Sequence, residues 1–245
     1  MASRPFPYAG YSEDVDKRVR VLFNGKFVVD AKKAKLVWEH AYYPTYYFQK
    51  LDVRLEYLKN EKPGATDSER VYDLVVDDRV AENAVTVFHA GPFQDSVKVI
   101  FSKADAWFEE DERIYVHPKD PYKRIDILET SKHIRVEIEG IEVANTVKAR
   151  LLYETGLPTR AYIPMTDIRL DLVTPSQLTT SCPYKGDASY FDVEHPTKKI
   201  KNLLWWYKNP TPESADIRGR VAFYNEKVDM WIDGVKQERP VSHFT

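Results

Sequence analysis

One segment of this chain occurs twice. Residues 19–56 align without a gap on residues 134–171, at an offset of 115 positions. The identical pairs include Arg20/Arg135, Gly25/Gly140, Lys33/Lys148, Ala34/Ala149, Glu39/Glu154, Tyr47/Tyr162, Asp52/Asp167 and Arg54/Arg169. A repeat of this length indicates one structural unit that is used twice. Because a unit of roughly 100–120 residues can bury its own core, the duplication predicts two tandem domains of one fold.

Later parts of the two copies also align, which sets the expected boundaries. Residues 106–118 match residues 222–234 at an offset of 116, and residues 85–92 fall opposite residues 203–210. Pro118 and Pro121 stand in a polar stretch between the copies and indicate a connector. We therefore expect an N-terminal arm (1–17), a first repeat (18–117), a linker (118–131), a second repeat (132–236) and a C-terminal tail (237–245).

Each copy begins with a predicted β-hairpin. Residues 19–23 and 134–138 alternate apolar and polar side chains, the pattern of a strand with one buried face. Asn24-Gly25 and Glu139-Gly140 then predict tight turns into a second strand. Further strands are expected at 35–40, 45–48, 53–58, 150–155, 160–164, 168–173, 188–193, 202–207, 220–225 and 228–233. A chain with only 9 Gly but 16 Tyr, 11 Phe and 5 Trp fits packed strands better than flexible loops.

One stretch of each copy departs from the strand pattern. Thr211 stands at a predicted N-cap, Pro212 at the first helical position and Gly219 just past the end, which predicts a short helix over residues 212–218. The equivalent stretch, residues 91–101, predicts the same helix in the first copy. The sequence thus indicates a mainly β protein of two antiparallel domains, each with one short helix.

Charge and composition restrict the classes of partner. With 36 basic and 38 acidic residues the formal net charge is −2, so no overall field attracts the protein to nucleic acid or to an anionic membrane. No apolar run approaches the length of a membrane span, and the first twenty residues lack the apolar region of a secretory signal. These patterns predict a cytoplasmic protein without nucleic-acid or membrane partners, and they leave the oligomeric state open.

The sequence also predicts neither a metal site nor a cofactor. Its single cysteine excludes an internal disulfide and a zinc site built on several thiolates. The six histidines show none of the HxH, HxxxH or HExxH spacings that bind metals. A site assembled from histidines and carboxylates across the fold stays open at this stage.

The second copy resembles a known family. Its Glu154-Thr155-Gly156, the pattern Arg-x-Tyr-x-Pro-x-x-Asp at 160–167, Cys-Pro-Tyr-Lys-Gly at 182–186 and Ala-Phe-Tyr-x-Glu-x-Val-Asp at 222–229 are similar to elements of the DUF427 proteins. The resemblance covers nearly all of residues 132–235. It implies a β-tent type fold, in which two antiparallel sheets lean together and pinch at one end. Proteins of similar architecture hold small ligands in aromatic cages, usually beside a structural zinc, and this sequence lacks the zinc cysteines.

The family carries a nucleotidyltransferase-like label, for which the sequence offers little support. No Gly-Ser followed by closely paired aspartates, the metal-binding pattern of such enzymes, is present. The first copy keeps Glu39, Tyr47, Asp52 and Arg54 but has Thr45 in place of Arg160 and nothing like Cys-Pro-Tyr-Lys-Gly. A single functional site is therefore expected in the second copy.

Cys182 permits two interpretations. Pro183 and Gly186 predict a tight turn that places Lys185 near the thiol, and a nearby ammonium favours the reactive thiolate. A lone cysteine is also among the residues most often buried as a small apolar side chain. No histidine is close in sequence to act as a base, although His195 could approach through folding.

The carboxylates offer a second catalytic candidate. Asp167, Arg169 and Asp171 alternate in the predicted strand 168–173 and its approach, so they are expected to share one face. The first copy retains Glu39, Asp52 and Arg54 opposite Glu154, Asp167 and Arg169, which favours a structural role for these residues over catalysis.

Three hypotheses follow from these patterns. The preferred one is a small-molecule-binding pocket between the sheets of the second copy, for a ligand with an anionic or planar group; its residues would be Arg160, Tyr162, Lys185, Tyr190, Trp206 and Tyr224. The second is a hydrolase or transferase that uses the same pocket, with Cys182 or Asp167 in the chemistry. The third is a protein-interaction scaffold that uses residues 4–11 or the charged loop 59–70.

Overall fold

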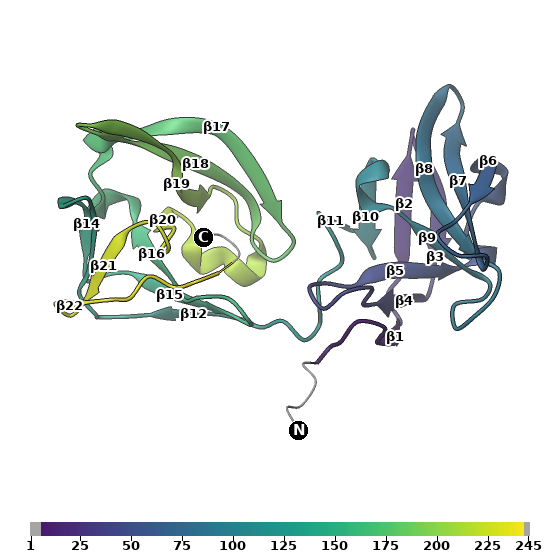
Figure 1. The fold of residues 1–245 in the computed structure, drawn as a ribbon, viewed down its shortest axis with the longest axis horizontal. Helices are drawn as coiled ribbons and strands as arrows, with labels where there is room; N and C mark the ends of the chain where they lie inside the picture. Colours follow the sequence, from purple (N-terminus) through teal and green to yellow (C-terminus); the bar gives the residue numbers. More distant parts are fainter. Residues whose placement is uncertain (1–5, 243–245) are drawn as a thin grey trace. The chain divides into compact units, whose positions relative to one another are not determined.

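The computed structural model describes residues 6–242, which form two compact units, Met1–Asp120 and Pro121–Thr245. Each unit contains one seven-stranded and one four-stranded sheet, and every strand pair is antiparallel (Figure 1). The predicted fold class, mainly β with two tandem antiparallel domains, is therefore confirmed. Since both units repeat one topology, the duplication seen in the sequence is a duplication of the whole fold.

The first unit has the following elements. Its larger sheet runs in the order β1 (Ser12–Val15), β4 (Ala34–Val37), β5 (Thr45–Gln49), β9 (Ser96–Val99), β8 (Arg79–Phe88), β7 (Glu69–Val76) and β6 (Leu58–Pro63). Its smaller sheet runs β11 (Glu112–Ile114), β10 (Ala106–Glu109), β2 (Val19–Phe23) and β3 (Lys26–Ala31). The short 3-10 helices are η1 (Lys50–Asp52), η2 (Leu55–Tyr57) and η3 (Phe101–Lys103).

The second unit repeats this order. Its larger sheet runs β12 (Ile125–Glu129), β15 (Arg150–Glu154), β16 (Arg160–Pro164), β20 (Arg220–Phe223), β19 (Lys198–Tyr207), β18 (Gly186–His195) and β17 (Val173–Cys182). Its smaller sheet runs β14 (Ile141–Thr146), β13 (Ile134–Ile138), β21 (Asp229–Ile232) and β22 (Val235–Lys236). The 3-10 helices are η4 (Met165–Asp167), η5 (Leu170–Leu172) and η6 (Pro212–Ile217).

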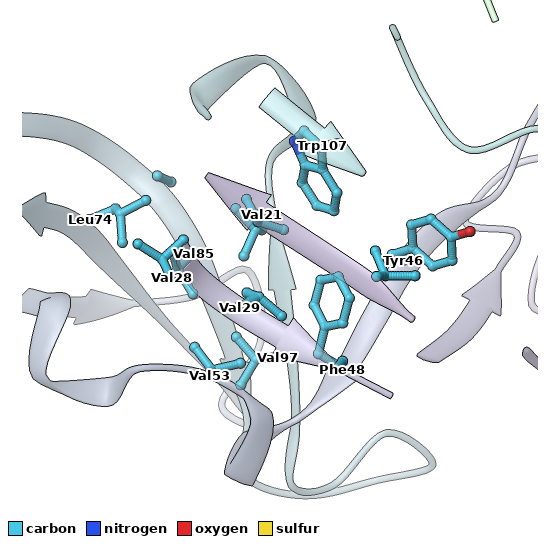
Figure 2. Close-up of a cluster of buried hydrophobic side chains, with 14 of the residues drawn as sticks. Val21, Val28, Val29, Tyr46, Phe48, Val53, Leu74, Val85, Val97 and Trp107 are labelled. Carbon is cyan, nitrogen blue, oxygen red and sulfur yellow. The ribbon is translucent and has the colours of Figure 1, made fainter. Parts of the chain in front are cut away.

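In each unit a core lies between the two sheets. Figure 2 shows it in the first unit, where Val21 and Val29 of the smaller sheet face Phe48 and Val97 of the larger one. All four side chains are at most 1% exposed. In the second unit Val136, Ile163 and Val221 belong to the corresponding cluster. The alternation of apolar residues along β2 and β13 thus buries one face of each strand, as the period of two requires.

The predicted hairpins at the start of each copy are present. β2 pairs with β3 and β13 pairs with β14. Asn24 and Gly25 have φ of 44° and 73°, and Glu139 and Gly140 have φ of 49° and 85°. Positive φ at both central residues is the signature of the tight turn that suits the twist of a hairpin. Glycine is favoured at the second position because it adopts this conformation without strain.

A polar contact that occurs in both units shows which residues are equivalent further along the chain. The Asp73 carboxylate accepts the backbone N–H of Asn83 at 2.8 Å, and the Asp192 carboxylate accepts that of Asn202 at 2.9 Å. Both asparagines have positive φ, 52° and 53°, and both pairs accompany a break in register within a hairpin. The equivalent residues here are 119 positions apart, not 118 as the alignment of 85–92 with 203–210 required.

The final strands also pair differently from the sequence alignment. Trp107 of β10 lies opposite Val21, and Met230 of β21 lies opposite Val136. Because Val21 and Val136 are equivalent, Trp107 corresponds to Met230, so the offset of 116 is wrong for residues 106–118. The second unit is longer in two places, the β17–β18 hairpin and the segment that contains η6. The first of these additions contains Cys182 and Lys185.

Several predicted local structures differ in the structure. The arm 1–17 and the linker 118–131 contain β1 and β12, which pair with β4 and β15. The charged stretch 59–70 forms most of β6 and the start of β7 rather than a loop. Residues 53–58 and 168–173 are largely 3-10 helix, not strand.

The predicted helices also need correction. Residues 212–217 form η6, a 3-10 helix with a kink at Ser214, and residues 91–101 form a turn, β9 and the start of η3. The side chain of Thr211 makes no cap hydrogen bond within the helix. The shorter connection in the first unit has no room for a matching element.

Part of the predicted arm packs on the first unit. The backbone N–H of Gly10 donates to the Trp38 carbonyl at 2.7 Å, and the rings of Tyr11 and Trp38 are 5.4 Å apart. Residues 6–11 therefore form part of this unit, and residues 1–5 lie outside the described part of the chain.

Truncation of Phe48 tests the packing between the sheets. We expect Phe48→Ala to lower the free energy of unfolding by about 3–5 kcal/mol, because it removes a buried ring and leaves a cavity. Denaturant unfolding followed by tryptophan fluorescence measures this change. Leu51→Ala, at a side chain that is 80% exposed, is the matched control and should change stability by about 0.5 kcal/mol or less. Equal effects of the two substitutions would contradict the assigned core.

Candidate functional site

A pocket of about 230 Å³ lies on one face of the larger sheet of the second unit. Its lining comes only from the strands of that sheet and the loops between them. The lining residues are Leu152, Glu154, Leu157, Pro158, Arg160, Tyr162, Thr180, Ser181, Cys182, Lys185, Tyr190, Trp205, Tyr207 and Tyr224. None belongs to β13, β14, β21 or β22, the strands of the smaller sheet. The pocket is therefore on the outer face of the larger sheet and not between the sheets, where the sequence analysis expected it.

Strand alternation explains this placement. In β16, Ala161 and Ile163 join the core between the sheets, while Arg160 and Tyr162 point to the opposite face. Both faces of the sheet are thus covered, because a second apolar cluster lies beneath the pocket. That cluster consists of Leu152, Tyr162, Ala188, Tyr190, Trp205, Tyr207, Ile217 and Ala222. In Figure 1, β17, β18 and β19 arch over the rest of this unit, and β18 and β19 supply much of the aromatic wall.

The turn between β17 and β18 is held by the segment that contains η6. The Tyr184 carbonyl accepts hydrogen bonds from the Thr211 hydroxyl at 2.5 Å and the Ser214 hydroxyl at 3.1 Å. The Thr211 N–H donates to the Lys185 carbonyl at 3.1 Å. Gly186 has φ of +97°, and a Cβ there would lie 3.1 Å from the Asn209 carbonyl oxygen. Only glycine meets both conditions without strain, so these contacts fix the position of Lys185.

Two buried ion pairs contribute to the pocket. The Lys185 ammonium donates to Glu154 Oε2 at 2.5 Å, and both side chains are about 10% exposed or less. The Arg160 guanidinium donates two hydrogen bonds to Glu226, at 2.8 and 2.7 Å, and Ser242 Oγ donates a third to the same carboxylate at 2.6 Å. Each cation of the pocket is thus matched by a carboxylate of the same unit.

Burial and hydrogen bonding set the protonation of these groups. Burial raises the pKa of Glu226, but hydrogen bonds from Arg160 and Ser242 outweigh it and lower the pKa to about 2. Burial raises the pKa of Tyr162 and of Tyr207 above the ordinary value. Burial and a hydrogen bond with Tyr190 raise the pKa of Tyr224 in the same way. At neutral pH the tyrosines therefore present uncharged hydroxyl groups, while Glu226 is a carboxylate.

Five of the six predicted ligand-binding residues come together in this pocket. They are Arg160, Tyr162, Lys185, Tyr190 and Tyr224. The sixth, Trp206, lies on the other face of β19, where it packs against the core between the sheets and its ring is 6.3 Å from that of Phe191. Its assignment to the pocket is wrong. The neighbouring Trp205 takes that place.

Sequence reasoning missed Trp205, Tyr207 and Glu154. Trp205 pairs with Tyr190, and its indole N–H donates to the Tyr162 hydroxyl at 3.3 Å. Alternation within β19 puts Trp205 and Tyr207 on one face, and the pairing of Trp205 with Tyr190 identifies that face as the pocket side. Glu154 was set aside as structural because the first copy retains it, whereas in the second unit it pairs with Lys185 at the pocket.

The fold does not bring the two predicted catalytic residues together in the pocket. Cys182 lines the pocket and is partly buried. Asp167 ends η4 and accepts hydrogen bonds from Thr146 at 2.6 Å and Thr166 at 2.9 Å, outside the pocket. These hydrogen bonds, with Thr146 the larger cause, lower the pKa of Asp167. Arg169 pairs with Asp171 beside η5, so the shared strand face expected for these charges is absent.

His195 stands at the far end of β18 from Cys182. Cys182 pairs with Gly186, the first residue of that strand, and His195 is the last of its 10 residues. A strand of that length spans roughly 30 Å at about 3.3 Å per residue. His195 therefore does not serve as a base for the thiol.

The first unit presents different side chains at the matching face. Thr86 and Val71 stand where the second unit has Trp205 and Tyr190, as the strand registers show. Phe93 packs on Tyr47 with ring centroids 4.9 Å apart. Glu39 accepts hydrogen bonds from Tyr47 at 2.7 Å and from Lys98 at 2.6 Å. The first unit thus lacks two rings of the aromatic wall, and its β6–β7 hairpin lacks the extension that carries Cys182 and Lys185 in the second unit.

The fold and the site define a class of protein: tandem domains of two antiparallel sheets, with a pocket of aromatic residues on the larger sheet of the second domain. The sequence pattern of the domain of unknown function DUF427, also labelled NTP_transf_9, matches residues 12–108 and 126–234. The chain belongs to this family and contains two copies of its domain. No curated protein matches the chain.

The described residues also bear on metal sites and on membrane spans. Within residues 6–242, no group of three or more His, Cys, Asp or Glu side chains is arranged to hold a metal ion. Within the same part of the chain, no helix has the length and apolar character needed to cross a membrane.

The Arg160–Glu226 pair generates a prediction on stability. We expect Glu226→Gln to lower the free energy of unfolding at pH 7 by about 3–5 kcal/mol, because it leaves a buried guanidinium without its charge partner. The pKa of Glu226 is lower in the folded state, so its stabilising effect is present above pH 4.5 and is lost as the pH falls towards 2. The difference between parent and variant, measured by urea unfolding, should therefore narrow over that range.

An exposed pair in the same unit provides the control. Asp171→Asn breaks the ion pair with Arg169, whose side chain is 54% exposed while that of Asp171 is 59% exposed. We expect a change of about 1 kcal/mol or less, since water screens this pair. A loss in Glu226→Gln no larger than that in Asp171→Asn would contradict a stabilising role for the buried pair.

Proposed function

We propose that the second unit is a small-molecule-binding module whose ligand occupies the pocket on the outer face of the larger sheet. The observation that supports it best is the group of five aromatic residues, Tyr162, Tyr190, Trp205, Tyr207 and Tyr224, around one concavity. Aromatic walls with a few fixed polar groups are typical of ligand sites. A volume of about 230 Å³ suits a molecule or group of one or two rings.

The contrast between the two units supports this proposal. The first unit keeps the fold with Thr86 and Val71 in place of Trp205 and Tyr190, so the fold does not need these rings. The hairpin with Cys182 and Lys185 is likewise an addition of the second unit. Side chains that the fold can do without, gathered at one pocket, are better explained by a ligand than by packing.

The nature of the walls favours a ligand with a planar group. A planar ring can stack on Trp205 or Tyr224, the closest of the aromatic pairs in the lining, whose centroids are 4.6 Å apart. The formal net charge of −2 favours a small molecule over a nucleic acid, whose binding depends on a surplus of basic residues.

A second candidate function is catalysis at the same pocket, and the position of Cys182 favours it. The thiol lines the pocket beside the hairpin that carries Lys185. The nucleophile would need a base, and the carboxylate that shares the lining, Glu154, is paired with Lys185. Binding without catalysis is therefore the better supported function.

Alkylation of Cys182 separates these two functions. We expect iodoacetamide to label the folded protein slowly, because Cys182 is partly buried and the Glu154 carboxylate of the same lining is paired with Lys185. The labelling should slow further when a ligand fills the pocket. Mass spectrometry of the single cysteine measures both rates, with denatured protein as the reference. Rapid labelling that persists in mildly acidic buffer would instead support a thiolate enzyme.

A thermal-shift screen of metabolites tests the binding function. We expect at least one compound with a planar ring to raise the melting temperature of the parent and to lose this effect in Trp205→Ala, because the ring contact is removed. Trp206→Ala is the matched control, since this tryptophan lies on the opposite face of the same strand. It should lower the melting temperature yet keep the ligand-induced rise. A compound that stabilises the parent and Trp205→Ala equally would place the ligand elsewhere.

A further inference from the structure

Three buried polar groups of the pocket have unused hydrogen-bonding capacity. The Lys185 ammonium has three N–H donors, of which one is used by Glu154. Oxygen Oε1 of Glu154 accepts no hydrogen bond from the residues that the structure describes. The Tyr207 hydroxyl, in a residue that is 5% exposed, also has no hydrogen-bond partner among residues 6–242. All three residues line the pocket, so a ligand atom can take the place of water as the hydrogen-bond partner of each group.

These groups lie close together. Glu154, Lys185 and Tyr207 all line the pocket, and the charge of Glu154 is among the influences that raise the pKa of Tyr207. Glu154 and Lys185 together present an acceptor next to a donor, with no net charge between them. We call this pair the polar edge of the pocket. A ligand with a carbonyl oxygen and an N–H group side by side would complement it.

The charges of the pocket disfavour an ionic ligand. An anion that accepted the free N–H groups of Lys185 would lie beside the Glu154 carboxylate, which is 2.5 Å from the same ammonium. At Arg160 it would meet Glu226, which already accepts two hydrogen bonds from the guanidinium. Each cation is thus already neutralised, and the nearby carboxylate repels a second anion. The expectation that Arg160 and Lys185 hold an anionic group therefore has less support than the planar alternative.

A cationic ligand is disfavoured for a related reason. The guanidinium of Arg160 lies 5.6 Å from the Trp205 ring centroid and 6.0 Å from that of Tyr224. It therefore already occupies the cation–π positions of these rings. A second cation would meet repulsion from Arg160 and would find Glu154 neutralised by Lys185.

We propose that the pocket takes an uncharged planar ring with an adjacent carbonyl and N–H group, such as an aromatic carboxamide or a heteroaromatic lactam. Lys185 donates to the carbonyl oxygen, the N–H group donates to Glu154 Oε1, and the Tyr207 hydroxyl donates a second hydrogen bond to the carbonyl oxygen. The ring lies against the aromatic wall. This inference rests on the proposed binding function and adds to it the class of ligand.

Three probes of nearly equal shape test the charge preference. Benzamide is neutral and has both a carbonyl and an N–H group, benzoate is its anionic counterpart, and benzamidinium its cationic counterpart. We expect benzamide to bind the intact chain at least 10-fold more tightly than either ion in ligand-observed NMR titrations at pH 7. Tighter or equal binding of an ion, or no detectable binding of benzamide, would overturn the inference.

Variants of the polar edge test which groups recognise the ligand. The double variant Glu154→Leu/Lys185→Met removes the edge without leaving a lone charge, and toluene serves as a probe without polar atoms. We expect this variant to bind benzamide at least 10-fold more weakly than the parent while toluene binding stays within 3-fold. Arg169→Met/Asp171→Leu, at the exposed pair, is the control and should leave both affinities unchanged. Equal losses for the two probes would contradict recognition by the edge.

Tyr207→Phe removes one hydroxyl and keeps the ring. We expect it to weaken benzamide binding about 3-fold or more and to leave toluene binding unchanged. An unchanged benzamide affinity would overturn the assigned role of Tyr207.

The proposed binding function and the proposed ligand class would be contradicted by different results. If Trp205→Ala abolishes binding of toluene and benzamide alike while the edge variants have no effect, the binding function stands and the ligand class is wrong. If no planar metabolite gives a rise that depends on Trp205, the binding function itself fails.

Discussion

The period of two along the strands of the larger sheet is the constraint on which the site depends. Each strand that crosses the middle of this sheet in the second unit is buried on both faces, one against the smaller sheet and one beneath the pocket. Ile163 and Tyr162 are neighbours in β16, yet the first stabilises the fold and the second lines the pocket. Because successive side chains alternate, any shift of one residue in pairing would exchange the two sets. The fold and the site are therefore fixed by the same register.

That dependence explains how much of the structure could be predicted. The duplication and the alternation at Val19–Phe23 and Ile134–Ile138 were enough to predict two antiparallel β domains, and the Asn-Gly and Glu-Gly pairs were enough to place their hairpins. The alternation and the turn pairs are local signals, and the duplication is read from two segments that align without a gap. The prediction of strands at 53–58 and 168–173 failed because alternating charges there come from 3-10 turns, whose ion pairs, such as Arg169 with Asp171, form between near neighbours.

The errors at the site follow from register as well. The alignment of 85–92 with 203–210 was one residue out, which made Val87 the counterpart of Trp205 instead of Trp206. Val87 is 2% exposed in the core of the first unit, so the correct alignment identifies Trp206 as the core-facing residue. The four-residue extension of the β17–β18 hairpin is what displaced the alignment. No pattern within the tryptophan pair itself could reveal its orientation, because both faces of β19 are apolar.

The presence of a residue in both copies was a poor guide to whether its role is structural. Glu39 and Glu154 occupy equivalent positions, but Glu39 accepts hydrogen bonds from Tyr47 and Lys98, while Glu154 pairs with Lys185 from the added hairpin. In the second unit Tyr162, the counterpart of Tyr47, is bound instead by the indole N–H of Trp205. The same carboxylate is therefore released from the tyrosine and faces the pocket. A residue kept by both units can thus tie two side chains together in one domain and line a pocket in the other.

The hairpin and the segment around η6 have to be considered together. Thr211 and Ser214 bind the Tyr184 carbonyl, and Gly186 passes close to the Asn209 carbonyl, so the two additions of the second unit support each other. The first unit has neither, and its Lys98 approaches Glu39 from a strand of the sheet itself. Replacing Thr86 by tryptophan would add one aromatic ring to the first unit, but it would not add the turn that carries Lys185 in the second unit. A pocket of this kind requires both additions, because the strands supply the aromatic wall and Glu154, while Lys185 comes from the turn that the segment around η6 anchors.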